Sequence, residues 1–218
     1  MLHAQSGVQV KKLSMADIRR SDTIEVANIE DAQRAGVYRL LSHILSAPPQ
    51  ADGLALVAGL TGESDTALGD AVNATAAAAR ATSPDAEADA YQTLFIGLGR
   101  GLLVPFGSYY LTGFLNEKPL ARLRQDMQLL GLERSEDFSE PEDHIASVLE
   151  IMGGLVDGSL VGVVDPEDQK RFFEMHVASW AGHFFRDLAG SEASAFYSAT
   201  GKLGEAFIEV EVRAFSLS

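Results

Sequence analysis

The chain has 218 residues, 46% of them hydrophobic, which is enough length and apolar content for a packed core. It contains no cysteine, which excludes disulfides, thiolate catalysis and cysteine-ligated metal sites, and favours a reducing compartment. With 31 acidic residues against 17 Lys and Arg, the net charge of -14 argues against binding to nucleic acid or anionic lipid.

The N-terminal segment carries few structural signals. Residues 1–30 have weak periodicity and mixed charge, so we expect a flexible or loosely docked arm before an all-helical domain over residues 31–218. The segment lacks the apolar core of a signal peptide. The uncharged run from Gly101 to Leu115 is broken by Pro105 and is shorter than the roughly 18 residues that a membrane helix needs. We therefore predict a cytoplasmic protein with no stable membrane insertion.

The first half of the domain shows helical periodicity after Asp31. Apolar residues recur at i, i+3, i+4 and i+7 up to Pro48-Pro49, which predicts a first core helix. This stripe consists of Val37, Leu40, Leu41, Ile44 and Leu45. Two further helices are expected over 54–60 and 66–81. Ser83-Pro84-Asp85 is typical of a helix start, and the helix that follows should end at the glycines of residues 97–101.

The second half predicts four more helices and one acidic loop. A short amphipathic helix over 120–130 should end at Gly131, and the most regular apolar stripe of the chain runs over 145–156. Asp165-Pro166 should open a long helix that reaches Leu188, and a last helix covers 196–210. No segment shows a convincing strand pattern. The sequence thus predicts an all-α, single-domain helical bundle of about eight or nine helices.

The acidic loop ends in the pentad Glu140-Pro141-Glu142-Asp143-His144. Residues 133–143 contain six acids against one arginine, a local charge of 1 − 6 = -5. Ser139 and Glu142 have capping-box spacing, Pro141 suits a first turn, and Asp143 complements the helix dipole, so the pentad predicts a helix start.

The same pentad also predicts a binding surface. At about 100° per residue, Asp143 points away from the 145–156 stripe and His144 lies at its edge. We expect an exposed carboxylate and a histidine near its ordinary pKa, which could accept an arginine or a backbone amide. An aromatic set could form the apolar wall of the same groove, although the residues alone favour ordinary core packing for it. It comprises Tyr91, Phe95, Phe106, Tyr109 and Tyr110.

Other constellations favour structural roles. Gly97-Leu98-Gly99-Arg100-Gly101 lacks the third glycine of a dinucleotide loop and follows a helix, so it predicts a tightly packed loop. Ser108, Asp143 and His144 have the residue types of a hydrolytic triad but no nucleophile elbow. His176 and His183 are seven residues apart, which is too far to share a metal ion. We expect no enzyme activity, no metal and no bound cofactor.

Two blocks of the chain resemble the TorD/DmsD/NarJ family of cytoplasmic chaperones for molybdenum-cofactor enzymes. The first is Tyr91-Gln92-Thr93-Leu94-Phe95, followed by Pro105-Phe106-Gly107-Ser108-Tyr109-Tyr110. The second is the family's E-P-x-D-H motif, matched at Glu140, Pro141, Asp143 and His144. A less specific likeness to the family's late aromatic helix lies in Phe173, His176, Trp180 and Phe184.

This resemblance implies an all-helical chaperone that binds the twin-arginine leader or the apo form of a molybdenum-cofactor oxidoreductase precursor, delaying export until cofactor insertion. Such a leader has two arginines followed by an apolar stretch. The resemblance implies leader contacts at Tyr91, Leu94, Phe95, Phe106, Tyr110, Glu140, Pro141, Asp143 and His144. The arginines would lie against Asp143 and the acids around Glu140, and the apolar residues against Tyr91 and Phe95.

The resemblance also implies weak GTP binding and either a monomer or a helix-swapped dimer. An alternative stays open: a nucleotide-binding switch or small-molecule enzyme that uses Glu140, Asp143 and His144.

Overall fold

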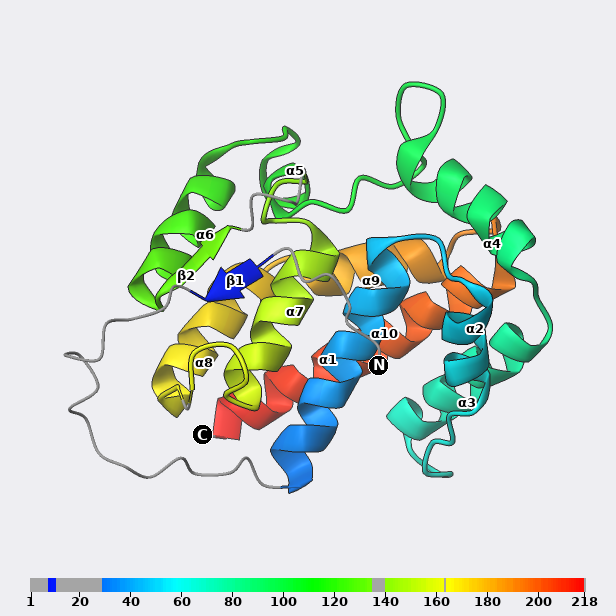
Figure 1. The fold of residues 1–218 in the computed structure, drawn as a ribbon, viewed down its shortest axis with the longest axis horizontal. Helices are drawn as coiled ribbons and strands as arrows, with labels where there is room; N and C mark the ends of the chain where they lie inside the picture. The colour runs from blue at the N-terminus through cyan, green and yellow to red at the C-terminus, as the bar shows by residue number, and fades with distance from the viewer. Residues whose placement is uncertain (1–7, 11–28, 135–139, 163, 218) are drawn as a thin grey trace.

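A computed structural model describes residues 8–10, 29–134, 140–162 and 164–217 of the chain. Within these ranges it is a bundle of ten α-helices with two π-helical segments and one small two-stranded sheet (Figure 1). The α-helices are α1 (Ile29–Ser46), α2 (Ala51–Ala58), α3 (Ala67–Arg80), α4 (Pro84–Tyr91), α5 (Gly107–Thr112), α6 (Lys118–Leu129), α7 (Ile145–Val156), α8 (Pro166–Phe173), α9 (Ala181–Ala189) and α10 (Ala195–Leu217). The π-helical segments are η1 (Gln92–Ile96) and η2 (Glu174–Ala178), and the strands are β1 (Val8–Val10) and β2 (Leu132–Arg134). The all-α prediction is confirmed.

Helix α7 lies at the centre of the bundle. Of its 12 residues, only Glu150 is not fully buried, because α1 packs along one side and α8 and η2 lie against another. A helix that is buried on all sides can be apolar all round. The stripe predicted over 145–156 is therefore the visible part of a helix whose other faces are also covered.

The C-terminal helix α10 packs very closely on α9. A Cβ at Gly201 would lie 2.3 Å from the backbone nitrogen of Ala189, and a Cβ at Gly204 would lie 2.1 Å from the Phe185 ring. These two glycines let the helix axes approach, and α10 also packs against α3. Helix α10 therefore runs across the back of the bundle and reaches the N-terminal half of the domain (Figure 1).

A buried charge cluster joins α10 to α1. The Glu211 side chain is fully buried and accepts hydrogen bonds from Arg34 Nε and Nη2, both at 2.8 Å, and from the Tyr38 hydroxyl at 2.9 Å. Burial and the Glu211 carboxylate together raise the pKa of Tyr38 well above its ordinary value. The Arg34 guanidinium also lies 5.1 Å from the centre of the Phe215 ring. The carboxylate of Glu211 is thus satisfied by one cation and one hydroxyl.

Most predicted helices are present, but three details differ. Helix α5 was not predicted, because its six residues are too short to show periodicity. The long helix predicted from Pro166 to Leu188 is divided into α8, η2 and α9, with the break at Trp180, whose φ of -149° is not helical. Two short strands were also missed: β1 pairs antiparallel with β2, with Gln9 opposite Glu133.

The predicted N-terminal arm, residues 1–30, lies mostly outside the described residues. Of this arm, the structure describes β1 and the first two residues of α1. In the described part of the chain, no helix is both long and apolar enough to span a membrane.

Replacement of Glu211 by alanine should lower the free energy of unfolding by about 2–4 kcal/mol, because Arg34 and Tyr38 lose a shared buried partner. Glu209→Ala is the matched control on the same helix, since Glu209 is exposed and its contact with Arg213 is 3.7 Å long. The control should change stability by less than about 0.5 kcal/mol. Urea denaturation of both variants measures the difference, and equal losses would contradict this role for Glu211.

Candidate functional site

The two sequence blocks singled out by the family resemblance meet in space. Phe106 and His144 form an antiparallel backbone bridge. On either side of it, Gly107 N donates to Asp143 O at 2.9 Å, and Ile145 N donates to Pro105 O at 2.8 Å. We call residues 104–108 and 141–145 together the motif clasp. The clasp fixes the start of α5 to the start of α7.

Asp143 is the polar centre of the motif clasp. Its side chain is only 4% exposed, and its Oδ2 accepts hydrogen bonds from Ser108 N, at 2.7 Å, and from Ser108 Oγ. Its Oδ1 is also buried, and no described group donates a hydrogen bond to it. The expectation of an exposed carboxylate was wrong, because the residue faces the first turn of α5 instead of solvent.

Glu142 is also buried and already paired. Arg124 of α6 donates to both of its oxygens, at 2.8 to 3.1 Å. Burial acts to raise the pKa of Glu142, but the hydrogen bonds from Arg124 act in the opposite direction, and the net pKa lies below its ordinary value. This carboxylate therefore joins α6 to the motif clasp and is not free to hold an incoming arginine.

His144 caps α7 in the place of the predicted capping box. Its Nδ1 accepts a hydrogen bond from Ala146 N at 3.2 Å, and the helix begins at Ile145. Burial lowers the pKa of His144 to about 4, so the ring is neutral at pH 7 and not near its ordinary pKa as expected. Pro141 precedes the helix instead of lying in its first turn, and Ser139 of the predicted box lies outside the described residues.

The predicted aromatic wall is divided between core and surface. Tyr91 and Leu94 are core residues, 7% and 0% exposed, which contradicts a place for them on the wall of a surface groove. Phe95, Phe106 and Tyr110 are half-buried. Phe95 and Tyr110 pack against the core, where Phe95 contacts Tyr91 with ring centres 4.9 Å apart, whereas Phe106 contacts the His144 ring at 5.1 Å.

Glu140 is the exposed acid of the pentad. It lies close enough to Tyr91 that its charge, together with the larger effect of burial, raises the pKa of the Tyr91 hydroxyl to about 12. Pro141 is half-buried beside it. The structure therefore brings Glu140, Pro141 and Tyr91 to one region, with Glu140 the carboxylate of this group that solvent reaches.

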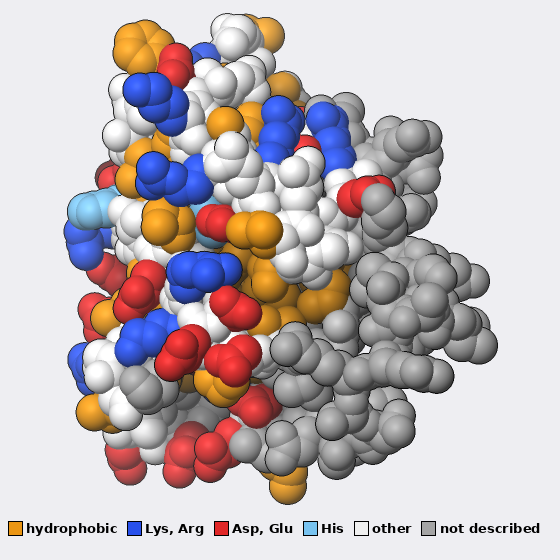
Figure 2. Space-filling model, turned by 90° about the vertical axis from the view of Figure 1, so that its left-hand side faces the viewer, with side chains coloured by type: hydrophobic (Ala, Val, Ile, Leu, Met, Phe, Trp, Pro, Cys, Tyr) orange, Lys and Arg blue, Asp and Glu red, His pale blue; other side chains and the backbone are white. Residues whose placement is uncertain are grey.

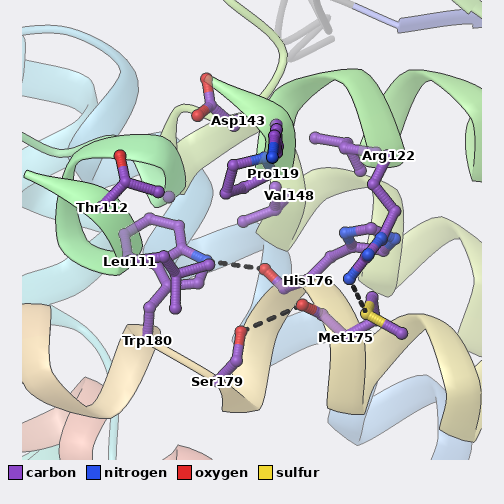
Figure 3. Close-up of a pocket in the computed structure, with 13 residues that line it drawn as sticks. Leu111, Thr112, Pro119, Arg122, Asp143, Val148, Met175, His176, Ser179 and Trp180 are labelled. Atoms are coloured by element: carbon purple, nitrogen blue, oxygen red, sulfur yellow. Dashed lines mark hydrogen bonds between the residues drawn. The ribbon is translucent and has the colours of Figure 1, made fainter. Parts of the chain in front are cut away.

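A pocket of about 360 Å³ opens beside the motif clasp, between α5, α6 and η2 (Figure 3). Trp180 forms one wall, and its Nε1 donates to His176 O at 2.8 Å. Gly107 lies against this indole so closely that a Cβ there would be 3.0 Å from Nε1. The lining residues are Gly107, Leu111, Thr112, Lys118, Pro119, Arg122, Leu123, Asp143, Val148, Met175, His176, Ser179 and Trp180.

The polar groups of the pocket are few and mostly engaged. His176 Nε2 lies 2.7 Å from Asp126 Oδ2. Burial lowers the pKa of His176 although the Asp126 carboxylate acts to raise it. Arg122 reaches across to Met175, with Nη1 3.6 Å from the sulfur. The pocket is thus an apolar hollow with two cationic side chains, Lys118 and Arg122, among its lining residues.

The geometry does not assemble a hydrolytic triad. Ser108 Oγ donates directly to Asp143, and the Nδ1 of His144 is used by its own helix. Among the described residues, no group of three or more His, Asp or Glu side chains is placed to hold a metal ion. What the site offers is an apolar hollow.

A family model described as "Nitrate reductase delta subunit" matches residues 61–186, a range that includes both halves of the motif clasp. The chain belongs to this family. The family assignment confirms the resemblance found from the two sequence blocks.

Curated relatives within this family are chaperone proteins TorD. That of Aliivibrio salmonicida is 28% identical over 55% of this chain and 59% of its own length. That of Aliivibrio fischeri is 27% identical over 83% of this chain and 94% of its own length. For the former, the match spans little more than half of the relative.

The fold of this delta subunit family member is also similar to a solved structure. An Archaeoglobus fulgidus protein described as a candidate redox enzyme maturation protein superposes with a TM-score of 0.53 at 22% identity, covering 81% of this chain and 93% of the other. At this identity the likeness concerns the fold.

The sequence did not indicate the pocket itself. Trp180 was noted only as part of an aromatic helix, and His176 as part of that helix and as a rejected metal ligand. Leu111, Lys118, Arg122 and Met175 were not singled out. These residues come from three separate helical segments, so no spacing along the chain connects them. Met175 lies in η2 and Ser179 directly after it, where the backbone departs from α-helical geometry, and both line the pocket with residues of α5 and α6.

Replacement of Asp143 by alanine should lower the free energy of unfolding by about 2 kcal/mol, because Ser108 N loses a charged acceptor in a buried place. An exposed carboxylate, as expected from the sequence, could instead be removed with little change in melting temperature. Glu140→Ala is the matched control in the same motif and should cost less than about 0.5 kcal/mol. Thermal unfolding followed by circular dichroism compares them, and an unaltered melting temperature for Asp143→Ala would refute the assignment.

His144 should make stability depend on pH. Its pKa is about 4 in the folded chain and about 6.5 when unfolded, so the unfolded chain binds the proton first as pH falls. The stability due to neutral His144 is complete above about pH 6.5, and up to about 3 kcal/mol is lost as pH falls toward 4.

His144→Asn keeps a cap acceptor but does not titrate, so its stability should fall less between pH 7 and pH 5 than that of the native chain. His176, whose pKa is also lowered, contributes a similar loss in both proteins. Urea denaturation at the two pH values measures the difference. Parallel losses in the two proteins would show that His144 is not the titrating group.

Proposed function

We propose that the chain is a cytoplasmic chaperone that binds the twin-arginine leader of a molybdenum-cofactor oxidoreductase precursor and assists its maturation before export. The observation that carries this proposal is the apolar pocket beside the motif clasp, in a chain whose curated relatives are chaperone proteins TorD. A pocket of this kind is suited to holding a peptide side chain.

The acidic character of the protein supports a cationic partner. The net charge of -14 attracts the arginine pair of a leader at long range. Of the motif residues, we assign the arginine contact to Glu140, which is exposed, in place of Asp143 and Glu142, whose carboxylates are buried and hydrogen-bonded. Pro141, Phe95, Phe106 and Tyr110 are the other proposed leader contacts that reach the surface in part.

The remaining motif residues have a positioning role in this proposal. Asp143 and His144 hold α5 and α7 together, and Tyr91 and Leu94 support Phe95 from the core. We further propose that the protein acts by binding and not as an enzyme. Its oligomeric state, monomer or helix-swapped dimer, stays a prediction that size-exclusion chromatography with light scattering tests.

The client can be found by affinity capture with the tagged full chain from a cytoplasmic extract of the source cell. We expect it to recover a molybdenum-cofactor oxidoreductase precursor whose leader peptide, made synthetically, binds the pure chain in isothermal titration calorimetry.

Glu140→Gln should weaken this binding by about three- to fivefold, the size of an exposed ion pair. Glu63→Gln, an exposed acid before α3, is the control and should bind as the native chain does. The proposal would be refuted if the native chain did not bind the leader peptide and bound the mature enzyme as well as it binds the precursor with its leader.

A further inference from the structure

We infer that the pocket takes a large apolar side chain from the leader's apolar stretch, and that the arginine pair stays outside it. This inference rests on the proposed function, and it assigns the part of the leader that enters the hollow. It departs from the expectation that an arginine lies against Asp143.

The walls and the size of the pocket fit an apolar side chain. Leu111, Leu123, Val148, Met175 and Trp180 come from α5, α6, α7, η2 and the turn before α9, and they surround about 360 Å³. That volume holds one or two large apolar side chains. Removing such a side chain from water is favourable in proportion to the apolar area covered.

The charges of the pocket disfavour a guanidinium. Lys118 and Arg122 both line the hollow, and Arg122 lies across from Met175. The lining carboxylate, Asp143, is at the opposite end from Met175 and Ser179 (Figure 3), and its Oδ2 is already occupied by Ser108. The buried Oδ1 of Asp143 has no described donor, but a cation that reached it would share the hollow with Lys118 and Arg122 and would lose its hydration among mainly apolar side chains.

The apolar lining continues onto the surface, where a partner can reach it. Leu111 is 44% exposed and Met175 is 39% exposed. Beyond Leu111, in the connection to α6, Phe114 and Leu115 are 68% and 48% exposed. Large apolar side chains that line a hollow and continue to an exposed turn form the kind of patch that marks an interaction site.

The surrounding face supplies a place for the arginines outside the pocket. Figure 2 shows Lys and Arg side chains over the upper and middle parts of this face, and most of its Asp and Glu, with a few further Lys and Arg among them, in the lower part. Glu174 directly precedes Met175 and is exposed. Glu167, the second residue of α8, is exposed as well. Glu140, the exposed acid assigned to the arginine contact, lies three residues before the lining residue Asp143, so a leader can keep its arginines outside the pocket while its apolar side chain fills it.

A double-mutant cycle by calorimetry tests the inference with the leader peptide of the captured precursor as the probe. The pocket variant combines Leu111→Ser with Met175→Gln, both at partly exposed positions. The control is Leu129→Gln, which removes a 76% exposed leucine of α6 that does not line the pocket. Two altered peptides complete the cycle: one has the large apolar residues of its stretch replaced by serine, and the other has both arginines replaced by glutamine.

We expect the pocket variant to bind the intact leader about tenfold more weakly than the native chain does. The pocket variant and the native chain should bind the serine peptide with equal affinity. The affinity of the variant for the glutamine peptide should still be about tenfold lower than that of the native chain. Leu129→Gln should leave all affinities unchanged. The single variant Met175→Gln, with a native melting curve, should show a smaller loss of the same pattern.

The inference would be overturned, and the proposed function kept, if native chain and pocket variant bound the glutamine peptide equally but still differed toward the serine peptide. That result would show that an arginine occupies the pocket. The inference would also be overturned if the pocket variant bound all three peptides about tenfold more weakly than the native chain. The substitutions would then act on the folding of the chain and not on a contact with the apolar stretch. Failure of the native chain to bind the intact leader would overturn both the proposed function and this inference.

Discussion

The site depends on one buried carboxylate that must be satisfied inside the protein. Asp143 is nearly inaccessible to solvent, and Ser108 N and Oγ satisfy its Oδ2. A buried charge without such partners would cost several kcal/mol, so the first turn of α5 is held where it can donate. The backbone bridge between Phe106 and His144 fixes the same two segments from the other side. The start of α5 and the start of α7 therefore form one rigid unit.

The pocket follows from this unit. With α5 held in place, Gly107 contacts the Trp180 indole, whose Nε1 is in turn bound by His176 O. Arg124 joins α6 to the unit through Glu142, so a third wall is fixed as well. The motif residues thus shape the hollow more than they line it. For this reason, changes at Asp143 affect stability and ligand binding together, whereas Leu111 and Met175 allow binding to be altered with the fold intact.

Local patterns predicted the helices because periodicity, caps and proline positions act over a few residues. The stripe over 145–156, the Ser83 cap and the glycines after Phe95 all correspond to observed boundaries. The exposure of Asp143 was wrong for a definite reason. The angular position of a residue relative to its own helix says which side of that helix it faces, but not what packs there. Asp143 faces away from the α7 stripe and toward α5, a short helix that periodicity cannot detect.

The sequence by itself determined the helical class, the family and the acidic charge of this protein, because these depend on composition, local spacing and two specific motifs. Only the tertiary structure decided which motif residues are buried and where the pocket lies. The pocket joins residues of α5 and α6 to Val148 of α7 and to the segment from Met175 to Trp180, and these contacts arise only when the helices pack. Within the pentad that looked like an exposed place for arginine, Glu142, Asp143 and His144 form the buried joint of the site, and Glu140 stays at the surface.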